Sequence, residues 1–327
     1  MTGNAPAIEV RDIHKRFEDV RAVDGIFFTV RRGEIFGFLG PNGAGKTTTI
    51  NLLTGLARPD AGTVGINGVD CTHDPKAAQR LIGVVPDTSN LYPELTGFEN
   101  LCFCGALYGM RKKERRARAR KLLDFFGLVD AASRRFVDYS RGMKRRLAIA
   151  AGIIHEPPIL FLDEPTTGID VSGALQIRRL ISDLHESGTT IFLTTHYIEE
   201  AERLCDRVAF IVAGRIVGID TVARFIQPVR DKHVLQISCA AVPDGILEDL
   251  ARSFTDLCFQ DLPGGLIRVE AESSVPVGPL VRFLEERGID VTEARRMRPS
   301  LEDVFIQITG IEAAAMQKEK EKKGIGR

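Results

Sequence analysis

A glycine-rich stretch near the amino end of the chain carries the residue types that bind phosphate. It matches the spacing G-x-x-x-x-G-K-T in full and comprises Gly40, Pro41, Asn42, Gly43, Ala44, Gly45, Lys46, Thr47 and Thr48. Glycines let successive backbone N–H groups converge on one phosphate, and the amino end of a following helix adds partial positive charge. We expect Lys46 to reach the β- and γ-phosphates of a bound nucleotide, and the Thr47 hydroxyl to bind a Mg²⁺ that bridges them.

Two carboxylates follow a later apolar run, where a buried strand is expected to end. Residues 159–162 are apolar, and Asp163 and Glu164 come directly after them. Ligands of open α/β sheets bind at the carboxyl ends of the strands. We expect Asp163 to lie beside the Mg²⁺ or to contact it through water, and Glu164 to polarise the attacking water as a general base.

A histidine closes another apolar run. His196 comes directly after residues 189–195, which predict a strand. A single histidine is more often structural than catalytic. At a strand end beside the γ-phosphate, however, its ring would hydrogen-bond the phosphate and hold the water and Glu164 in line.

The order of the expected elements places these residues along one sheet. An apolar strand over residues 34–39 precedes the glycine-rich stretch and a helix over residues 48–53 follows it. A helix over residues 174–186 separates two of the expected strands, which indicates a parallel sheet. The remaining strands are expected over residues 8–12, 23–30, 81–86, 208–212 and 214–217, of which the first two and the last two form antiparallel pairs.

The middle of the chain, residues 88–155, predicts a helical subdomain. Thr96 and Glu99 have the spacing of a capping box, so a helix is expected to begin after Thr96. Residues 111–121 then hold eight basic residues and one acidic residue, Glu114. A solvated helix face is the favoured interpretation, and a face near anionic lipid headgroups is the alternative.

Composition limits the function classes. Lys plus Arg and Asp plus Glu both number 44 in 327 residues, so no net charge favours a nucleic-acid partner. The six cysteines are scattered, and we expect reduced, cytosolic thiols. The start of the chain lacks the pattern of a secretory signal, and no apolar run approaches the roughly 18 residues of a membrane span. If this protein serves a membrane, another chain is expected to supply the spans.

Together with these motifs, residues 139–146, Tyr-Ser-Arg-Gly-Met-Lys-Arg-Arg, resemble the signature loop of the ATP-binding subunit of ABC transporters. The resemblance covers about residues 7–220 and implies a head-to-tail dimer with a second ATP-binding subunit, as a homodimer. In such a dimer Ser140 and the backbone at Gly142 would contact the γ-phosphate in the partner's cradle. Arg141 stands where the family commonly has glycine, a difference that an outward-pointing side chain would tolerate.

The same resemblance assigns further residues. Phe17 would stack on the adenine, His196 would be the switch histidine, and Asp170 would lie in the loop that crosses the dimer interface. Asp87 stands where the family usually has a glutamine that touches Mg²⁺ and the attacking water. An aspartate can bind Mg²⁺ through water, but it adds negative charge and has no amide donor. A nucleotide-gated regulatory module with weak hydrolysis is therefore the alternative to a transport motor.

The last third of the chain predicts a second domain. Its expected order of elements, βαββαβ, is that of a small ferredoxin-like α+β sandwich, after a linker at Gln227, Pro228, Asp231 and Lys232. Residues 299–305 resemble the close of ATP subunits in the drug-export, antibiotic-resistance (daunorubicin-type) branch. We expect an ABC ATPase domain over residues 1–225, an accessory domain over 231–310 and a disordered tail over 311–327.

The predicted fold class is thus α/β: a P-loop NTPase with a parallel core sheet, an antiparallel β subdomain and a helical subdomain, followed by the small α+β domain. The predicted protein is the ATPase of an exporter. It would work with a separately encoded membrane permease at the cytoplasmic face of the cell membrane.

Overall fold

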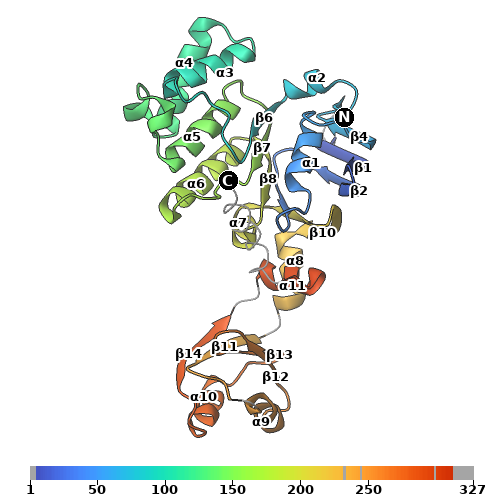
Figure 1. Cartoon of the computed structure of the whole chain (residues 1–327), viewed down its shortest axis with the longest axis vertical. Helices are drawn as coiled ribbons and strands as arrows, with labels where there is room; N and C mark the ends of the chain where they lie inside the picture. Colours follow the sequence, from blue (N-terminus) through green and yellow to red (C-terminus); the bar gives the residue numbers. More distant parts are fainter. Residues whose placement is uncertain (1–4, 231–232, 244, 298–299, 312–327) are drawn as a thin grey trace. The chain divides into compact units, whose positions relative to one another are not determined.

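The computed structural model describes residues 5–230, 233–243, 245–297 and 300–311, and the chain forms two compact units (Figure 1). The first unit runs to Thr221 and takes in the chain again from Ile308; the second is Val222–Gln307. Among the described residues, no helix has both the length and the apolar character that a membrane crossing requires.

The first unit is built on a sheet whose strands lie in the order β10-β9-β3-β8-β7-β6. β3 pairs in parallel with β8 and β9, and β7 pairs in parallel with β6 and β8. The carboxyl ends of β3, β6, β7 and β8 therefore lie along one edge. These strands are β3 (Ile35–Leu39), β6 (Ile82–Val85), β7 (Ile159–Asp163), β8 (Thr190–Thr195), β9 (Arg207–Val212) and β10 (Arg215–Thr221), the last two forming the predicted hairpin.

An antiparallel sheet in the order β2-β1-β4-β5 packs beside the parallel one. The ring of Phe28 on β2 stacks on that of Phe36 on β3, with centroids 5.5 Å apart, and lies 6.0 Å from that of Phe192 on β8. The two sheets thus share one aromatic core, which fixes the strands that carry the candidate site. The antiparallel strands are β1 (Ile8–Phe17), β2 (Val20–Val30), β4 (Ala61–Ile66) and β5 (Val69–Asp70).

The helices of this unit include the predicted helical subdomain, where α3, α4 and α5 lie together (Figure 1). The capping box is confirmed: Glu99 N donates to Thr96 Oγ1 at 3.2 Å, and Thr96 N donates to Glu99 Oε2 at 2.9 Å. The α-helices are α1 (Lys46–Leu53), α2 (Pro75–Gln79), α3 (Gly97–Leu107), α4 (Lys112–Phe125), α5 (Arg141–Gly152), α6 (Val171–Glu186) and α7 (Ile198–Leu204), with 3-10 turns η1 (Val129–Ala131) and η2 (Phe136–Asp138).

The second unit confirms the ferredoxin-like prediction, with its sheet in the order β12-β13-β11-β14. Figure 1 shows α9 and α10 on one face of this sheet, where Leu250, Leu280 and Leu284 join a buried core with Leu235 and Ile267 of the strands. Its elements are α8 (Val222–Arg230), β11 (His233–Cys239), α9 (Ile246–Ser253), β12 (Cys258–Leu262), β13 (Leu266–Ala271), α10 (Val277–Glu285), β14 (Val291–Met297) and α11 (Leu301–Thr309) as far as Gln307.

One local prediction is wrong. Gln227 and Pro228, expected in a linker, lie inside α8. Proline has no N–H to donate to the carbonyl four residues before it, which disfavours helix past the first turn, and α8 ends two residues after Pro228, at Arg230. Asp231 and Lys232, and the tail from residue 312, lie outside the described residues.

Candidate active site

The phosphate-binding loop joins β3 to α1, and neighbouring backbone holds it closely. A Cβ atom at Gly40 would lie 2.1 Å from the carbonyl oxygen of Ile211, and one at Gly45 would lie 2.3 Å from that of Ala22. Gly45 also has φ +106°, in the left-handed region that favours glycine. The loop thus packs closely against the backbone of β2 and of β9. The helix α1 begins directly after it, at Lys46, two residues earlier than expected.

The side chain of Lys46 connects this loop to the end of β7. Its Nζ donates to the carbonyl oxygens of Gly40 at 2.8 Å and Pro41 at 3.2 Å, and lies 3.3 Å from Oε1 of Glu164. Lys46 is 6% exposed. A buried ammonium held at the mouth of a phosphate loop can bind phosphate oxygens as a point charge.

Asp163 lies beside Thr47, as a shared Mg²⁺ site requires. Thr47 Oγ1 donates to Oδ2 of Asp163 at 3.0 Å, and Thr194 Oγ1 donates to Oδ1. Burial raises the pKa of Asp163, the nearby charges of Glu164 and Asp87 add to the rise, and the two hydroxyls oppose it. A hydroxyl and a carboxylate in contact are the hard oxygen donors that Mg²⁺ takes beside phosphates, so the pair fits this ion.

Glu164 has a left-handed backbone, with φ +49°, which is uncommon for a residue with a Cβ and is typical of functional turns. Its Oε2 lies 2.8 Å from Nδ1 of His196 and accepts from Thr167 Oγ1 at 3.0 Å. Burial raises the pKa of Glu164, but His196, Lys46 and Thr167 outweigh that effect, so the pKa is lowered overall. The carboxylate is therefore ionised at neutral pH and able to accept a proton.

Asp87 follows β6 at the same edge of the sheet. The residue is exposed, and its carbonyl oxygen accepts a hydrogen bond from Arg145 at 3.3 Å. Because its charge contributes to the raised pKa of Asp163, it belongs to the same electrostatic environment. A carboxylate at this position repels a negatively charged nucleotide, whereas a neutral amide would not.

Phe17 is the last residue of β1. The residue is 51% exposed, and Nζ of Lys15 lies 5.3 Å from the ring centroid. Phe17 pairs with Val20, two residues before Ala22, whose carbonyl oxygen approaches the phosphate loop at Gly45. The exposed ring therefore lies on the strand pair that borders the loop.

The signature segment and the loop of Asp170 line one hollow of about 380 Å³, in which Ser140, Arg141, Gly142 and Gly168 also take part. Ser140 caps α5 by accepting from Met143 N at 3.3 Å, and Asp170 caps α6 by accepting from Gly173 N at 2.6 Å. The amino ends of both helices thus meet in this hollow, where their dipoles favour an anion.

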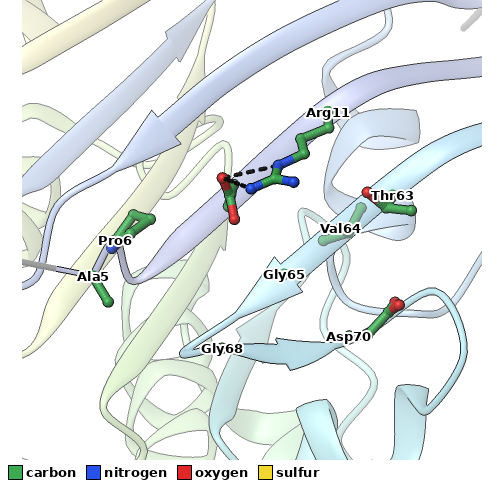
Figure 2. Close-up of a pocket in the computed structure, with 9 residues that line it drawn as sticks. Ala5, Pro6, Arg11, Thr63, Val64, Gly65, Gly68 and Asp70 are labelled. Carbon is green, nitrogen blue, oxygen red and sulfur yellow. Dashed lines mark hydrogen bonds and ion pairs between the residues drawn. The ribbon is translucent and has the colours of Figure 1, made fainter.

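A further hollow of about 250 Å³ lies on the antiparallel sheet (Figure 2). It is lined by Arg11 of β1, Thr63 and Val64 of β4, and Asp70 of β5, all labelled in Figure 2. The Arg11 guanidinium pairs with the carboxylate of Glu9 at 2.6 Å. An exposed ion pair on one strand contributes little to the stability of the fold. The residues predicted for the site are absent from the described lining of this hollow.

Sequence reasoning missed three side chains in this region. Thr194 and Thr167 bind the carboxylates of Asp163 and Glu164, and Arg145 binds backbone around them. The sequence could have indicated both threonines, because each lies close to a predicted site residue: Thr194 is two residues before His196, and Thr167 is three residues after Glu164.

Comparisons with known proteins identify the family of the chain. A family model described as ABC transporter matches residues 23–167. The daunorubicin resistance ATP-binding protein DrrA3 of Streptomyces coeruleorubidus is 38% identical over 314 residues, covering 93% of this chain and 96% of that protein. The chain belongs to the ABC transporter family.

Other relatives of this ABC protein include the linearmycin resistance ATP-binding protein LnrL of Bacillus subtilis (strain 168), 34% identical over 306 residues, with 93% of this chain and 98% of that protein covered. Among solved structures, the ATP-binding subunit of an ABC transporter has a TM-score of 0.62 and 31% identity, over 68% of this chain and 93% of that one. A dimeric cassette, MJ0796, bound to ADP and Pi, has a TM-score of 0.61 and 27% identity, over 65% and 98%.

These findings confirm the predicted fold class and the resemblance to the drug-resistance branch. ABC ATP-binding domains bind and hydrolyse ATP, so this ABC protein is an ATPase whose hydrolysis is coupled to transport.

Proposed function

We propose that this chain is the ATP-hydrolysing motor of an exporter whose membrane-spanning permease is a separate polypeptide. The observation that supports the proposal best is found at one sheet edge, where Lys46 and His196 both contact Glu164 and the neighbouring Asp163 contacts Thr47. Its relatives include resistance proteins named for daunorubicin and linearmycin. We therefore propose an antibiotic or drug as cargo, chosen mainly by the permease.

In the proposed mechanism, the phosphate loop binds ATP, Lys46 contacts the β- and γ-phosphates, and Phe17 stacks on the adenine. Thr47 and Asp163 would hold Mg²⁺, and Asp87 would act on it through water. When bound, the ion neutralises charge on the phosphate oxygens. Glu164 accepts the proton of the attacking water, and His196 keeps that carboxylate and the water in line.

Two copies of the chain would assemble head to tail, so that Ser140, Arg141, Gly142 and Asp170 of one subunit face the γ-phosphate held by the other. The hollow that these residues line and the dimeric cassette among the structural neighbours support this arrangement. ATP would close the dimer and hydrolysis would reopen it, with the helical subdomain passing the motion to the permease.

The permease would hold the protein at the cytoplasmic face of the membrane. The exposed basic residues Lys112, Arg116 and Arg120 recur every four positions on α4 and form one stripe. Such a stripe would gain about 1 kcal/mol per cation near anionic lipid headgroups.

A second candidate is the nucleotide-gated module that closes on ATP but hydrolyses it slowly. The observation that favours it is the contribution of Asp87 to the raised pKa of Asp163. Excess negative charge near the Mg²⁺ ligands would slow the chemical step while leaving the phosphate loop intact.

The test compares steady-state ATP hydrolysis by the wild type, Glu164→Gln and Asp87→Gln, with dimerisation followed by light scattering. Glu199→Gln is the control, because Glu199 is an exposed glutamate on α7. The motor proposal expects turnover in the wild type and the control, and an inactive Glu164→Gln variant that dimerises in ATP. Turnover in Asp87→Gln alone would favour the second candidate. Binding of ATP without a dimer under any condition would contradict the head-to-tail arrangement.

A further inference from the structure

The side chain of Arg145 lies at the centre of the catalytic segments, although the mechanism above gives it no role. Arg145 is on α5 and is 7% exposed. Its Nε donates to the carbonyl oxygen of Pro165 at 2.9 Å, and its NH2 group donates to those of Glu164, at 2.6 Å, and Asp163. These bonds hold the backbone on either side of the left-handed turn at Glu164.

The other arm of the same guanidinium reaches the end of β6. NH1 donates to the carbonyl oxygens of Pro86 at 2.5 Å and Asp87 at 3.3 Å. One planar cation therefore joins two chain segments that each carry a carboxylate of the site. A guanidinium has five N–H donors in a rigid planar arrangement. If either segment moves and the guanidinium follows it, the hydrogen bonds to the other segment are lost.

Electrostatics agree with this contact pattern. Burial lowers the pKa of Arg145, and the carboxylates of Asp87 and Asp163 oppose that effect most strongly. A buried cation is costly unless hydrogen bonds and opposite charges compensate it. Here backbone carbonyls supply the hydrogen bonds and the site carboxylates supply the opposite charges. The buried charge of Arg145 is therefore compensated only while the two segments stay in place.

Arg145 is also five residues from Ser140, which caps the same helix. Five residues of α-helix rise about 7.5 Å, so both belong to one rigid element. A shift of the signature end of α5 must therefore move the guanidinium against Asp87 and Glu164.

We propose that Arg145 is a positioning residue that holds the Asp87 and Glu164 segments in register for hydrolysis and connects them to the signature loop. Through the proposed head-to-tail dimer, on which this second part rests, the arginine couples closure around one ATP to the alignment of Glu164 at the other.

The experiment uses the full chain with Arg145→Gln and Arg145→Lys, beside Arg207→Lys as a matched control. Arg207 is also a largely buried arginine, bound to Glu34 at 2.9 Å and to the carbonyl oxygen of Thr29, but at the amino end of β9. Because misplacing a catalytic group by about 1 Å costs about 100-fold in rate, we expect kcat to fall by about that factor in Arg145→Gln. Arg145→Lys should be intermediate, and KM for ATP should change by less than about threefold in both.

Hydrogen exchange measured by mass spectrometry distinguishes positioning from general destabilisation. Faster exchange confined to peptides covering residues 84–90 and 163–168 is expected in the Arg145 variants, and not in Arg207→Lys. Should Arg145→Gln not fold, Arg145→Lys carries both measurements. Wild-type kcat in folded Arg145→Lys, or exchange that rises evenly along the chain in the Arg145 variants, would overturn the proposal.

The coupling is measured in a Glu164→Gln background. We expect Glu164→Gln to dimerise in ATP and the added Arg145→Lys change to raise the ATP concentration for half-dimerisation by about tenfold, a typical allosteric coupling. An unchanged midpoint would overturn the coupling part. A Glu164→Gln protein that never dimerises would refute the proposed dimer and the coupling with it, while the kcat and exchange measurements still test the positioning role.

Discussion

Nδ1 of His196 lies 2.8 Å from Oε2 of Glu164, and both residues are 6% exposed. β8 and β7 are adjacent parallel strands, with Asp163 in register with Thr194, so a histidine just after β8 and a glutamate just after β7 must come close. The contact keeps a buried carboxylate ionised and fixes the direction in which it points.

Replacing His196 with alanine is expected to change the pH dependence of hydrolysis. In the wild type the pKa of Glu164 lies below its usual value of 4.5, although burial alone would raise it. Without the imidazole, the effect of burial is opposed less strongly, so the pKa of Glu164 rises. Because protonated Glu164 cannot act as a base, the acidic limb of the kcat/KM profile should move to higher pH. We also expect kcat at neutral pH to fall by about tenfold or more.

The measurement is a pH profile of kcat/KM for the wild type and His196→Ala, with His73→Ala as the control. His73 is exposed on the antiparallel side of the unit, where it pairs with Asp70. An acidic limb that stays in place in His196→Ala would mean that the imidazole does not set the protonation of Glu164.

Thr47→Val should weaken the response to Mg²⁺. The valine keeps the shape of threonine but removes the hydroxyl that lies 3.0 Å from Oδ2 of Asp163. Since loss of a group that ligates or orients a metal typically costs 10- to 100-fold in metal affinity, the Mg²⁺ concentration for half-maximal hydrolysis should rise by about that factor. Thr47→Ser, which keeps a hydroxyl, should stay close to the wild type. Equal Mg²⁺ requirements in the two variants would exclude the hydroxyl as a ligand.

Features that depend on neighbours in the chain could be predicted from the sequence. The capping box at Thr96 involves residues three positions apart, and the strand ends at Asp163 and His196 follow from apolar runs that stop at polar residues. The parallel order of the strands then brings these ends together without further information.

Contacts between distant segments could not be predicted in this way. Arg145 binds carbonyl oxygens that lie 58 and 59 residues before it and 18 to 20 residues after it in the chain. Because every residue type has a backbone carbonyl, the sequence does not indicate which residues accept these hydrogen bonds. The prediction at Pro228 was also wrong: proline disfavours a helix past its first turn, yet α8 continues through Pro228 and ends two residues later, at Arg230.

Thr96→Ala is expected to destabilise the helical subdomain. The variant removes the side chain that accepts from Glu99 N at 3.2 Å and thus leaves a donor at the start of α3 without its cap. Loss of an N-cap costs about 1 kcal/mol in free energy of unfolding, which urea denaturation followed by circular dichroism would detect. Glu99→Gln should cost less, because glutamine also completes a capping box. If both variants matched the wild type, the cap would be irrelevant to stability.

Gly45→Ala should damage the phosphate loop far more than a glycine replacement elsewhere. An alanine there would combine a left-handed φ of +106° with a Cβ placed 2.3 Å from the carbonyl oxygen of Ala22, so the loop or β2 must move. Gly33 is the matched control, because its φ is +66° and its added Cβ would meet nothing within 4 Å. The strained backbone alone costs about 1 to 3 kcal/mol, so Gly33→Ala should lose an amount in that range and bind ATP normally.

Gly45→Ala should lose more stability than Gly33→Ala, and its ATP affinity should fall by at least about tenfold, which corresponds to 1.4 kcal/mol. Thermal unfolding and equilibrium binding of radiolabelled ATP measure the two quantities on the same samples. Equal behaviour of the two variants in both assays would mean that the close approach of Ala22 does not constrain the loop. A loss of ATP affinity in Gly45→Ala alone would place the effect in the phosphate loop, because the two variants share the left-handed strain and differ in what the added methyl group meets.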